Sequence, residues 1–198
     1  TVNTGAVLDF ETTPTINVTG RVTDQGGLTY DKAFTVTLTN MNEAPTALTL
    51  SKNSVVENSA AGTVVGTLAG TDPDAGSVLS YSLTNNAGGK FVVNATTGVI
   101  TVNTGAVLDF ETTPTINVTG RVTDQGGLTY DKAFTVTLTN VNEAPTALTL
   151  SKNSVAENSA AGTVIGTLAG TDPDAGSILT YSLTNNAAGK FVVNATTG

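Results

Sequence analysis

The sequence predicts an all-β protein built from tandem seven-stranded, immunoglobulin-like Greek-key sandwiches. Thr and Val, which are β-branched and favour strands, are abundant, and Gly, Asn, Asp and Pro mark turns at frequent intervals. No window rich in Ala, Leu, Glu and Lys is long enough for a helix. The chain also repeats itself with a period of 100 residues, which is the size of one such sandwich.

The two copies of the repeat are nearly identical. Residues 1–98 match residues 101–198 at a constant offset, with six differences. The differing pairs are Met41/Val141, Val56/Ala156, Val65/Ile165, Val78/Ile178, Ser80/Thr180 and Gly88/Ala188. None changes a charge, so both copies are expected to adopt one structure. A period of this length exceeds that of solenoid and propeller units and favours independent domains in series.

Linkers are predicted where the segment Asn-x-Asn-Glu-Ala-Pro follows an alternating strand, at residues 40–45 and 140–145. This places a complete domain at residues 45–143, with a C-terminal half-domain at 1–44 and an N-terminal half-domain at 144–198. The halves would expose strand edges and apolar faces. Head-to-tail copies of the chain could complete each other. Alternatively, the sequence is a section of a longer chain, which we favour because two exposed half-domains would be a poor gene product.

Alternation of apolar and polar residues predicts seven strands in one complete domain. Their expected ranges are 46–51, 63–70, 78–84, 91–93, 99–102, 115–123 and 134–139. Turn residues separate them, as at 74–76, 85–88, 96–98 and 124–127. The inward-facing residues are expected to be Leu48, Leu50, Val64, Leu68, Leu79, Tyr81, Leu83, Ile116, Val118, Val122, Phe134, Val136 and Leu138.

Charge and composition exclude several functions. A net charge of −8 disfavours nucleic acid and anionic membrane surfaces as partners. No stretch approaches 18 consecutive apolar residues, so no membrane insertion is expected. His and Cys are absent, which removes the commonest general base, Cys-ligated zinc and any disulfide framework. We therefore expect no enzymatic activity, because the paired carboxylates that could serve a glycosidase are better explained by a metal.

Each 100-residue unit carries eight carboxylates, all expected at strand ends or in loops. Any single pair, such as Asp72 and Asp74, fits solvated surface acids equally well. Taken together they favour calcium, because Ca²⁺ takes six to eight oxygen ligands from carboxylates, Asn side chains and backbone carbonyls. An EF-hand beginning at Asp72 is excluded, since its twelfth position is Leu83 rather than Glu. In the first unit the acids are Asp9, Glu11, Asp24, Asp31, Glu43, Glu57, Asp72 and Asp74.

Six motifs, in order across the whole unit, resemble those of the cadherin repeat in its bacterial cadherin-like form. Each motif is weak alone, but their order and spacing make the resemblance specific. Seven of the eight acids per unit fall on the family's ligand positions, and Asp31 and its copy Asp131 do not. The motifs are Val56-Glu57-Asn58, residues 71–76 around Asp72-Pro73-Asp74, residues 91–100 from Phe91 to Ile100, Leu108-Asp109-Phe110-Glu111, residues 122–127 around Asp124, and residues 140–145.

The resemblance implies calcium between successive domains. At the first junction the implied ligands are Asp9, Glu11, Asn40, Asn42 and Glu43 of one domain and Asp72, Asp74 and Asp124 of the next. At the second junction they are Glu57, Asp109, Glu111, Asn140, Asn142 and Glu143, with Asp172 and Asp174. Asn40 and Asn140 replace the family's leading linker Asp and the linker is one residue shorter, so two ions per junction are expected rather than three. Trp is absent, so strand exchange through an N-terminal Trp is not expected.

We therefore expect a calcium-stiffened extracellular stalk or filament protein of a bacterial cell surface, serving adhesion or structure. Its expected partners are neighbouring repeats of the same chain or head-to-tail copies of it. The alternative is a bacterial surface module that binds polysaccharide. Its candidate contacts are Tyr30 and Tyr130, because the other aromatic side chains are expected in the core.

Overall fold

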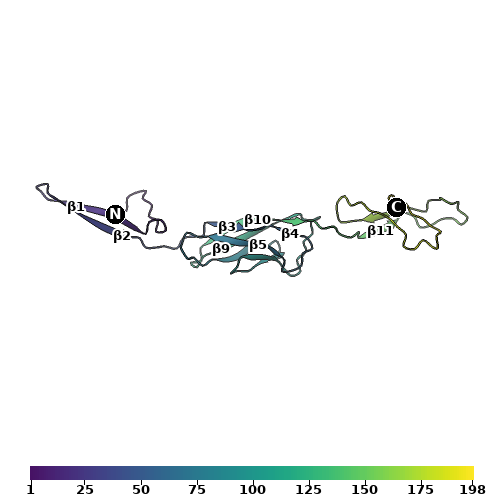
Figure 1. Cartoon of the computed structure of the whole chain (residues 1–198), viewed down its shortest axis with the longest axis horizontal. Helices are drawn as coiled ribbons and strands as arrows, with labels where there is room; N and C mark the ends of the chain where they lie inside the picture. The colour runs from purple at the N-terminus through teal and green to yellow at the C-terminus, as the bar shows by residue number, and fades with distance from the viewer.

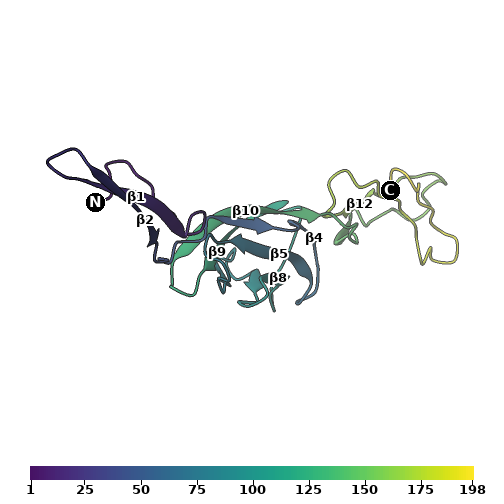
Figure 2. The same ribbon diagram turned by 60° about the vertical axis from the view of Figure 1, so that its left-hand side comes forward.

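The computed structural model describes residues 1–198 and is a long, thin molecule with three bodies in a row (Figure 1). We name these the N-terminal body (residues 1–44), the middle sandwich (45–143) and the C-terminal body (144–198). A view turned by 60° keeps this order and shows the N-terminal body inclined to the middle sandwich (Figure 2). No helix in the structure could cross a membrane.

The middle sandwich contains two four-stranded sheets, with the orders β3-β5-β8-β7 and β4-β10-β9-β6. Neighbours that are not consecutive in sequence make the connections cross over, which confirms the predicted all-β Greek-key class. All pairs are antiparallel except β4 with β10. The strands are β3 (Ala47–Leu50), β4 (Ser54–Val56), β5 (Val64–Thr71), β6 (Ser80–Asn85), β7 (Phe91–Val93), β8 (Val99–Val102), β9 (Thr115–Thr123) and β10 (Thr129–Thr139).

Both sheets contribute to one core of 13 buried hydrophobic residues. Leu48 and Leu68 come from the first sheet, and Val118 and Val122 from the second. Because successive side chains of a strand point to opposite faces, the alternating residues of β9 place their apolar members on the buried face. Gly120 belongs to this face, and a Cβ there would lie 3.1 Å from atoms of both Leu48 and Leu68.

The structure contains a short strand, β4, that the sequence analysis did not predict. The sequence predicts one strand at 46–51, but β3 ends at Leu50 and the separate strand β4 pairs in parallel with β10 of the other sheet. The crossing segment is tied down by Asn53. Its side-chain amide donates to the Thr135 carbonyl at 3.0 Å, and its own carbonyl accepts from the Thr137 N–H at 2.8 Å. The chain thus bridges both sheets along one edge.

A β-bulge makes the sequence-based assignment of Val64 wrong. The pairing of β5 with β8 shifts register between Val64 and Gly66, so Val64 faces solvent and Val65 is fully buried. Gly66 permits this geometry, because a Cβ there would lie only 2.0 Å from the Lys52 carbonyl oxygen of the crossing segment. One extra residue in a bulged strand reverses the faces of the residues beside it.

The last strand begins earlier than expected, at Thr129 rather than at 134, and this places Asp131 inside the strand. Asp131 lies directly opposite Arg121 of β9, whose Nε is 2.7 Å from its Oδ1. Asp31 and Arg21 form the same pair at 2.6 Å. The expectation that all acids lie at strand ends or in loops is therefore wrong for these two. A cross-strand Arg neutralises each of them.

The end bodies repeat pieces of the middle sandwich. In the N-terminal body, β1 (Thr15–Thr23) and β2 (Thr29–Thr37) pair as β9 and β10 do. In the C-terminal body, β11 (Ala147–Leu150) and β12 (Leu168–Thr171) pair in the register of β3 and β5. Identical sequences thus reach the same local pairing in both places.

We expect Val65→Ala to lower the free energy of unfolding of the middle sandwich by about 2 kcal/mol, because two buried methyl groups are lost and a cavity remains. Val64→Ala is the matched control and should cost less than about 0.5 kcal/mol. Urea denaturation of both variants measures the difference. An equal loss of unfolding free energy in Val65→Ala and Val64→Ala would contradict the bulge.

Candidate metal centre

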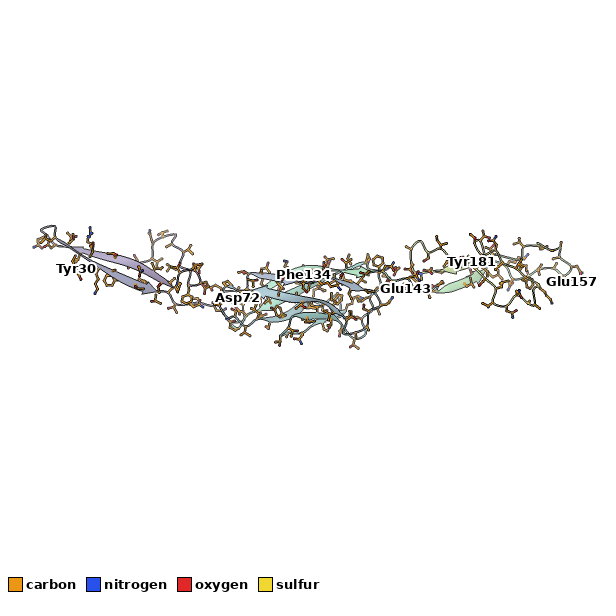
Figure 3. The ribbon with its side chains drawn as sticks, viewed as in Figure 1. Tyr30, Asp72, Phe134, Glu143, Glu157 and Tyr181 are labelled. Atoms are coloured by element: carbon orange, nitrogen blue, oxygen red, sulfur yellow. The ribbon has the colours of Figure 1, made fainter.

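At the first junction, between the N-terminal body and the middle sandwich, three carboxylates from two bodies converge. Oxygen atoms of Glu11, Glu43 and Asp74 all lie within 4.8 Å of one another. Glu11 precedes β1, Glu43 lies in the linker, and Asp74 follows β5. The β5–β6 loop lies at the end of the middle sandwich that faces the N-terminal body, as Asp72 shows in Figure 3.

Local hydrogen bonds fix the loop that holds Asp72 and Asp74. Asp72 Oδ1 accepts from the Asp74 N–H at 3.0 Å and from the Ser77 hydroxyl at 2.6 Å. Its other oxygen, Oδ2, is buried and has no hydrogen-bond partner. A buried carboxylate oxygen without a partner is costly, and a cation beside it would remove that cost.

The first linker is tied to the middle sandwich mainly by neutral donors. Asp74 accepts from the Asn40 side-chain amide and from the Glu43 N–H, both at 2.9 Å. Asn42 donates to Asp124 Oδ2 at 2.7 Å, and its amide oxygen accepts from Gln125 at 2.8 Å. The linker therefore contacts both the loop after β5 and the turn after β9.

The second junction, between the middle sandwich and the C-terminal body, has its own carboxylate cluster. Oxygen atoms of Glu57, Asp109 and Glu111 lie within 4.8 Å of one another. Glu57 is 2% exposed and accepts from two backbone N–H groups, those of Phe110 and Val141, each at 2.8 Å. Glu111 Oε1 accepts from the Asn140 amide at 3.0 Å. Glu111 Oε2 is buried without a partner, like Asp72 Oδ2.

The C-terminal body is hydrogen-bonded to the second linker. The Glu143 N–H donates to Asp174 Oδ2 at 2.7 Å, which repeats the bond between Glu43 and Asp74. Asp172 Oδ1 accepts from the Asp174 N–H at 3.0 Å, as at the first junction. Asn142 donates within its own linker, to the Glu143 carbonyl at 3.1 Å. Glu143 lies between the two bodies in Figure 3.

The charges of these groups act on one another. Burial, followed by repulsion from Glu11, Asp74, Asp9 and Asp72, raises the pKa of Glu43 above its ordinary value. Burial raises the pKa of Glu111, and the charges of Glu57, Glu143 and Asp174 raise it further. At each junction, the acids that repel Glu43 or Glu111 come from both of the adjoining bodies. Asp9 and Asp174 thus belong to the same electrostatic groups as the clustered acids.

Two Asp residues instead have their charged form stabilised by hydrogen bonds. The side chain and N–H of Thr112 lower the pKa of Asp109. For Asp124, burial acts to raise the pKa, but hydrogen bonds from Asn42 and from the backbone of its turn bring it below its ordinary value. Both side chains are therefore held ionised with fixed orientations.

Two contacts at the junctions involve residues outside the predicted ligand sets. The Asn58 amide donates to Glu143 Oε1 at 2.7 Å, and Gln125 positions Asn42. In the sequence, the only feature that points to Asn58 and Gln125 is that each lies next to an acid of a motif. Glu157, the copy of Glu57, lies at the far end of the C-terminal body, away from both junctions (Figure 3).

Comparison with known proteins gives the family. Residues 52–140 match the cadherin domain model. Residues 1–40 and 152–198 repeat parts of this segment at an offset of 100 residues. The chain belongs to the cadherin repeat family. This confirms the resemblance at the level of the family, and cadherin repeats are non-enzymatic adhesion domains.

Curated relatives of this cadherin chain are large animal proteins. It is 34% identical over 146 residues to "Protocadherin Fat 4" of Mus musculus, which covers 70% of the chain and 3% of that protein. It is 32% identical over 194 residues to "Protocadherin-like wing polarity protein stan" of Drosophila melanogaster, covering 91% of the chain and 5% of that protein. The chain thus spans a small part of these relatives. Their source lends no support to the predicted bacterial form.

Solved cadherin structures match the arrangement of the whole chain. Mouse Cadherin-23 EC22-24 has a TM-score of 0.70 and 29% identity, over 98% of this chain and 65% of that one. Protocadherin Gamma B2 extracellular cadherin domains 3-6 have a TM-score of 0.69 and 27% identity, over 96% of this chain and 49% of that one. These likenesses extend across both junctions, so the bodies are arranged as cadherin-type sandwiches in tandem.

Without divalent cations, ionisation of Glu111 should destabilise the folded protein. Because its folded pKa is raised, the folded state holds the proton longer, and stability falls as pH rises from the ordinary Glu range through the folded pKa. Glu111→Gln should therefore melt at a higher temperature than the parent at pH 7 in chelator, with little difference near pH 3.

Asp131→Asn is the control, because it should change the melting temperature at pH 7 in the opposite direction. The pKa of Asp131 is lowered by Arg121, so its contribution is present above the ordinary Asp pKa and is lost in acid. This variant should melt below the parent at pH 7. Glu111→Gln melting below the parent at pH 7 would contradict the repulsion.

Proposed function

We propose that this chain is a calcium-stiffened extracellular stalk or filament segment, in which the ions hold successive cadherin sandwiches in line. The observation that supports it most strongly is the approach of Glu11 and Glu43 of one body to Asp74 of the next, within 4.8 Å. Hard carboxylate and amide oxygens are the ligands that Ca²⁺ prefers. The buried, partnerless oxygens of Asp72 and Glu111 fit such a donor set.

The proposed ligands are the residues that the family motifs imply. At the first junction these are Asp9, Glu11, Asn40, Asn42, Glu43, Asp72, Asp74 and Asp124. At the second they are Glu57, Asp109, Glu111, Asn140, Asn142, Glu143, Asp172 and Asp174. The bound cation supplies positive charge to both clusters. Asn40 and Asn140 add carbonyl oxygen without charge, which favours two ions per junction. The repeat boundary at 45–143 belongs to the same proposal, since it puts every cluster at a boundary.

The stiffening follows from charge. Without cations, repulsion between bodies works against the short linkers, and the bodies should flex about them. Calcium cancels the repulsion and ties oxygen atoms of both bodies to common ions. Extracellular calcium modules have dissociation constants of about 10⁻⁴–10⁻³ M, so the junctions would be rigid outside a cell and loose in cytosol.

Polysaccharide binding through the two tyrosines is less well supported. Tyr30 is exposed in the N-terminal body, but Tyr130 is half-buried and packs against the core of the middle sandwich. A completed sandwich therefore lacks the exposed ring that the hypothesis needs. Bacterial origin stays a prediction from the motif form alone.

The test is small-angle scattering and thermal melting of the full chain in calcium and in chelator. Calcium should lengthen the maximum dimension and raise the melting temperature. Asp74→Asn should reduce the response at the first junction and Asp174→Asn at the second, because each removes a charge that lies between bodies.

Asp131→Asn serves as the matched control, since this acid pairs with Arg121 and lies outside both clusters. It should leave the calcium response unchanged. Identical scattering and melting with and without chelator would rule out calcium stiffening. An equal loss of response in Asp131→Asn and Asp74→Asn would show that net charge, rather than the clusters, is responsible.

A further inference from the structure

Gln125, in the turn between β9 and β10, joins three segments of the chain at the first junction. Its Oε1 accepts a hydrogen bond from the Val78 N–H, just before β6, at 3.0 Å. Its Nε2 donates to Oδ1 of Asn42, a linker residue, at 2.8 Å. Gln125 carries no charge and belongs to neither predicted ligand set. It therefore connects the linker to the middle sandwich by a contact that needs no cation.

The partners of Gln125 and Asn42 fix the orientation of both side-chain amides. The Val78 N–H can only donate, so it selects the oxygen of the Gln125 amide and leaves the nitrogen facing Asn42. On the other side, the Asn42 nitrogen donates to Asp124 Oδ2 at 2.7 Å. An ionised carboxylate only accepts, so Asn42 cannot reverse its amide without placing two oxygens against each other. The row of hydrogen bonds from Val78 to Asp124 is therefore satisfied in one orientation only.

The Asn42 side chain also fills the space beside Gly126. A Cβ at Gly126 would lie 2.6 Å from Asn42 Nδ2 and 2.9 Å from its Oδ1. Gly126 lacks the positive φ of Gly127, so a side chain at this position is opposed by Asn42 rather than by the backbone conformation. Packing and hydrogen bonding thus hold Asn42 in the same place independently of each other.

We propose that Gln125 is a positioning residue that clamps Asn42, and with it the first linker, onto the middle sandwich in the absence of cations. The other bonds from the linker to the middle sandwich, made by Asn40 and the Glu43 N–H, both end on Asp74, whose charge also repels Glu43. The Gln125 bond is made to a neutral amide and brings no such repulsion. Without calcium, bending at this junction is then confined to the residues between β2 and Asn42.

The clamp also affects the metal centre. Asn42 and Asp124 are proposed ligands, and Gln125 holds the first against the second. One side of the junction is therefore assembled before a cation arrives, which reduces the ordering cost of binding. This step rests on the proposed function, whereas the clamp itself rests on hydrogen bonds and packing.

Spin-label distance measurements on the full chain in chelator test the clamp. The chain has no Cys, so Met41→Cys and Val92→Cys place one label on the linker and one on β7 of the middle sandwich. Both native side chains are exposed. The labelled parent should give a narrow distance distribution in chelator, because the linker is docked, and calcium should change it little.

Gln125→Glu should broaden this distribution in chelator. A carboxylate can still accept from the Val78 N–H, but it cannot donate to Asn42 Oδ1, and it adds charge beside Asp124. Gly126→Ala should broaden the distribution without any change of charge, because its Cβ takes the space of the Asn42 side chain.

Asn86→Asp is the matched control for Gln125→Glu. It adds the same charge in the β6–β7 turn and keeps the acceptor for the Gly89 N–H, so the distribution should stay narrow. A melting temperature of the middle sandwich equal to that of the parent shows that a variant is folded.

A broad distribution for the parent in chelator would overturn the clamp, as would a narrow one in either folded variant. If calcium then narrowed the broad parent distribution, the proposed function would stand while the clamp failed. A narrow parent distribution that broadens in both variants supports the clamp, even where scattering shows no response to calcium.

Discussion

Repulsion between carboxylates of neighbouring bodies is the interaction on which the shape of the whole molecule depends. Burial is the first cause of the raised pKa values of Glu43 and Glu111, and acids of their own and of the adjoining body raise them further. The linkers oppose this repulsion with neutral hydrogen bonds, such as those from the Glu43 and Glu143 N–H groups to Asp74 and Asp174. Each such bond is made to a charged carboxylate and contributes about 1.5–3 kcal/mol. Attraction and repulsion therefore oppose each other at a junction, and a divalent cation can change the balance.

The sandwich core determines where those charges lie. Packing of β3 and β5 against β9 fixes the two ends of the sandwich, and the acids occupy loops at those ends. Asp74 lies at one end, while Glu57 and Glu111 lie at the other. Each sandwich thus presents different acids to its two neighbours. A mutation that loosens the core would displace both sets, so the stability of the core and the geometry of the acidic clusters are linked through the strands.

The sequence predicted most of the strands, because the alternation of apolar and polar residues is a local property. It failed at Val64, since a bulge depends on the close approach of Lys52 to Gly66, which lies far from it in the chain. It also placed Asp131 outside a strand, because its Arg121 partner becomes visible only once the register is known. The hydrogen bond from Asn58 to Glu143 joins residues 85 positions apart and left no local pattern.

Near-identity of the repeats makes every half-sandwich compatible with every complementary half. Val65 is the one buried hydrophobic core residue among the six differing positions, and Ile165 is a conservative replacement. Pairing within one domain is then favoured by proximity rather than by specificity. Gly98 joins the halves of the middle sandwich through a short connection, which gives an effective concentration in the millimolar range or above.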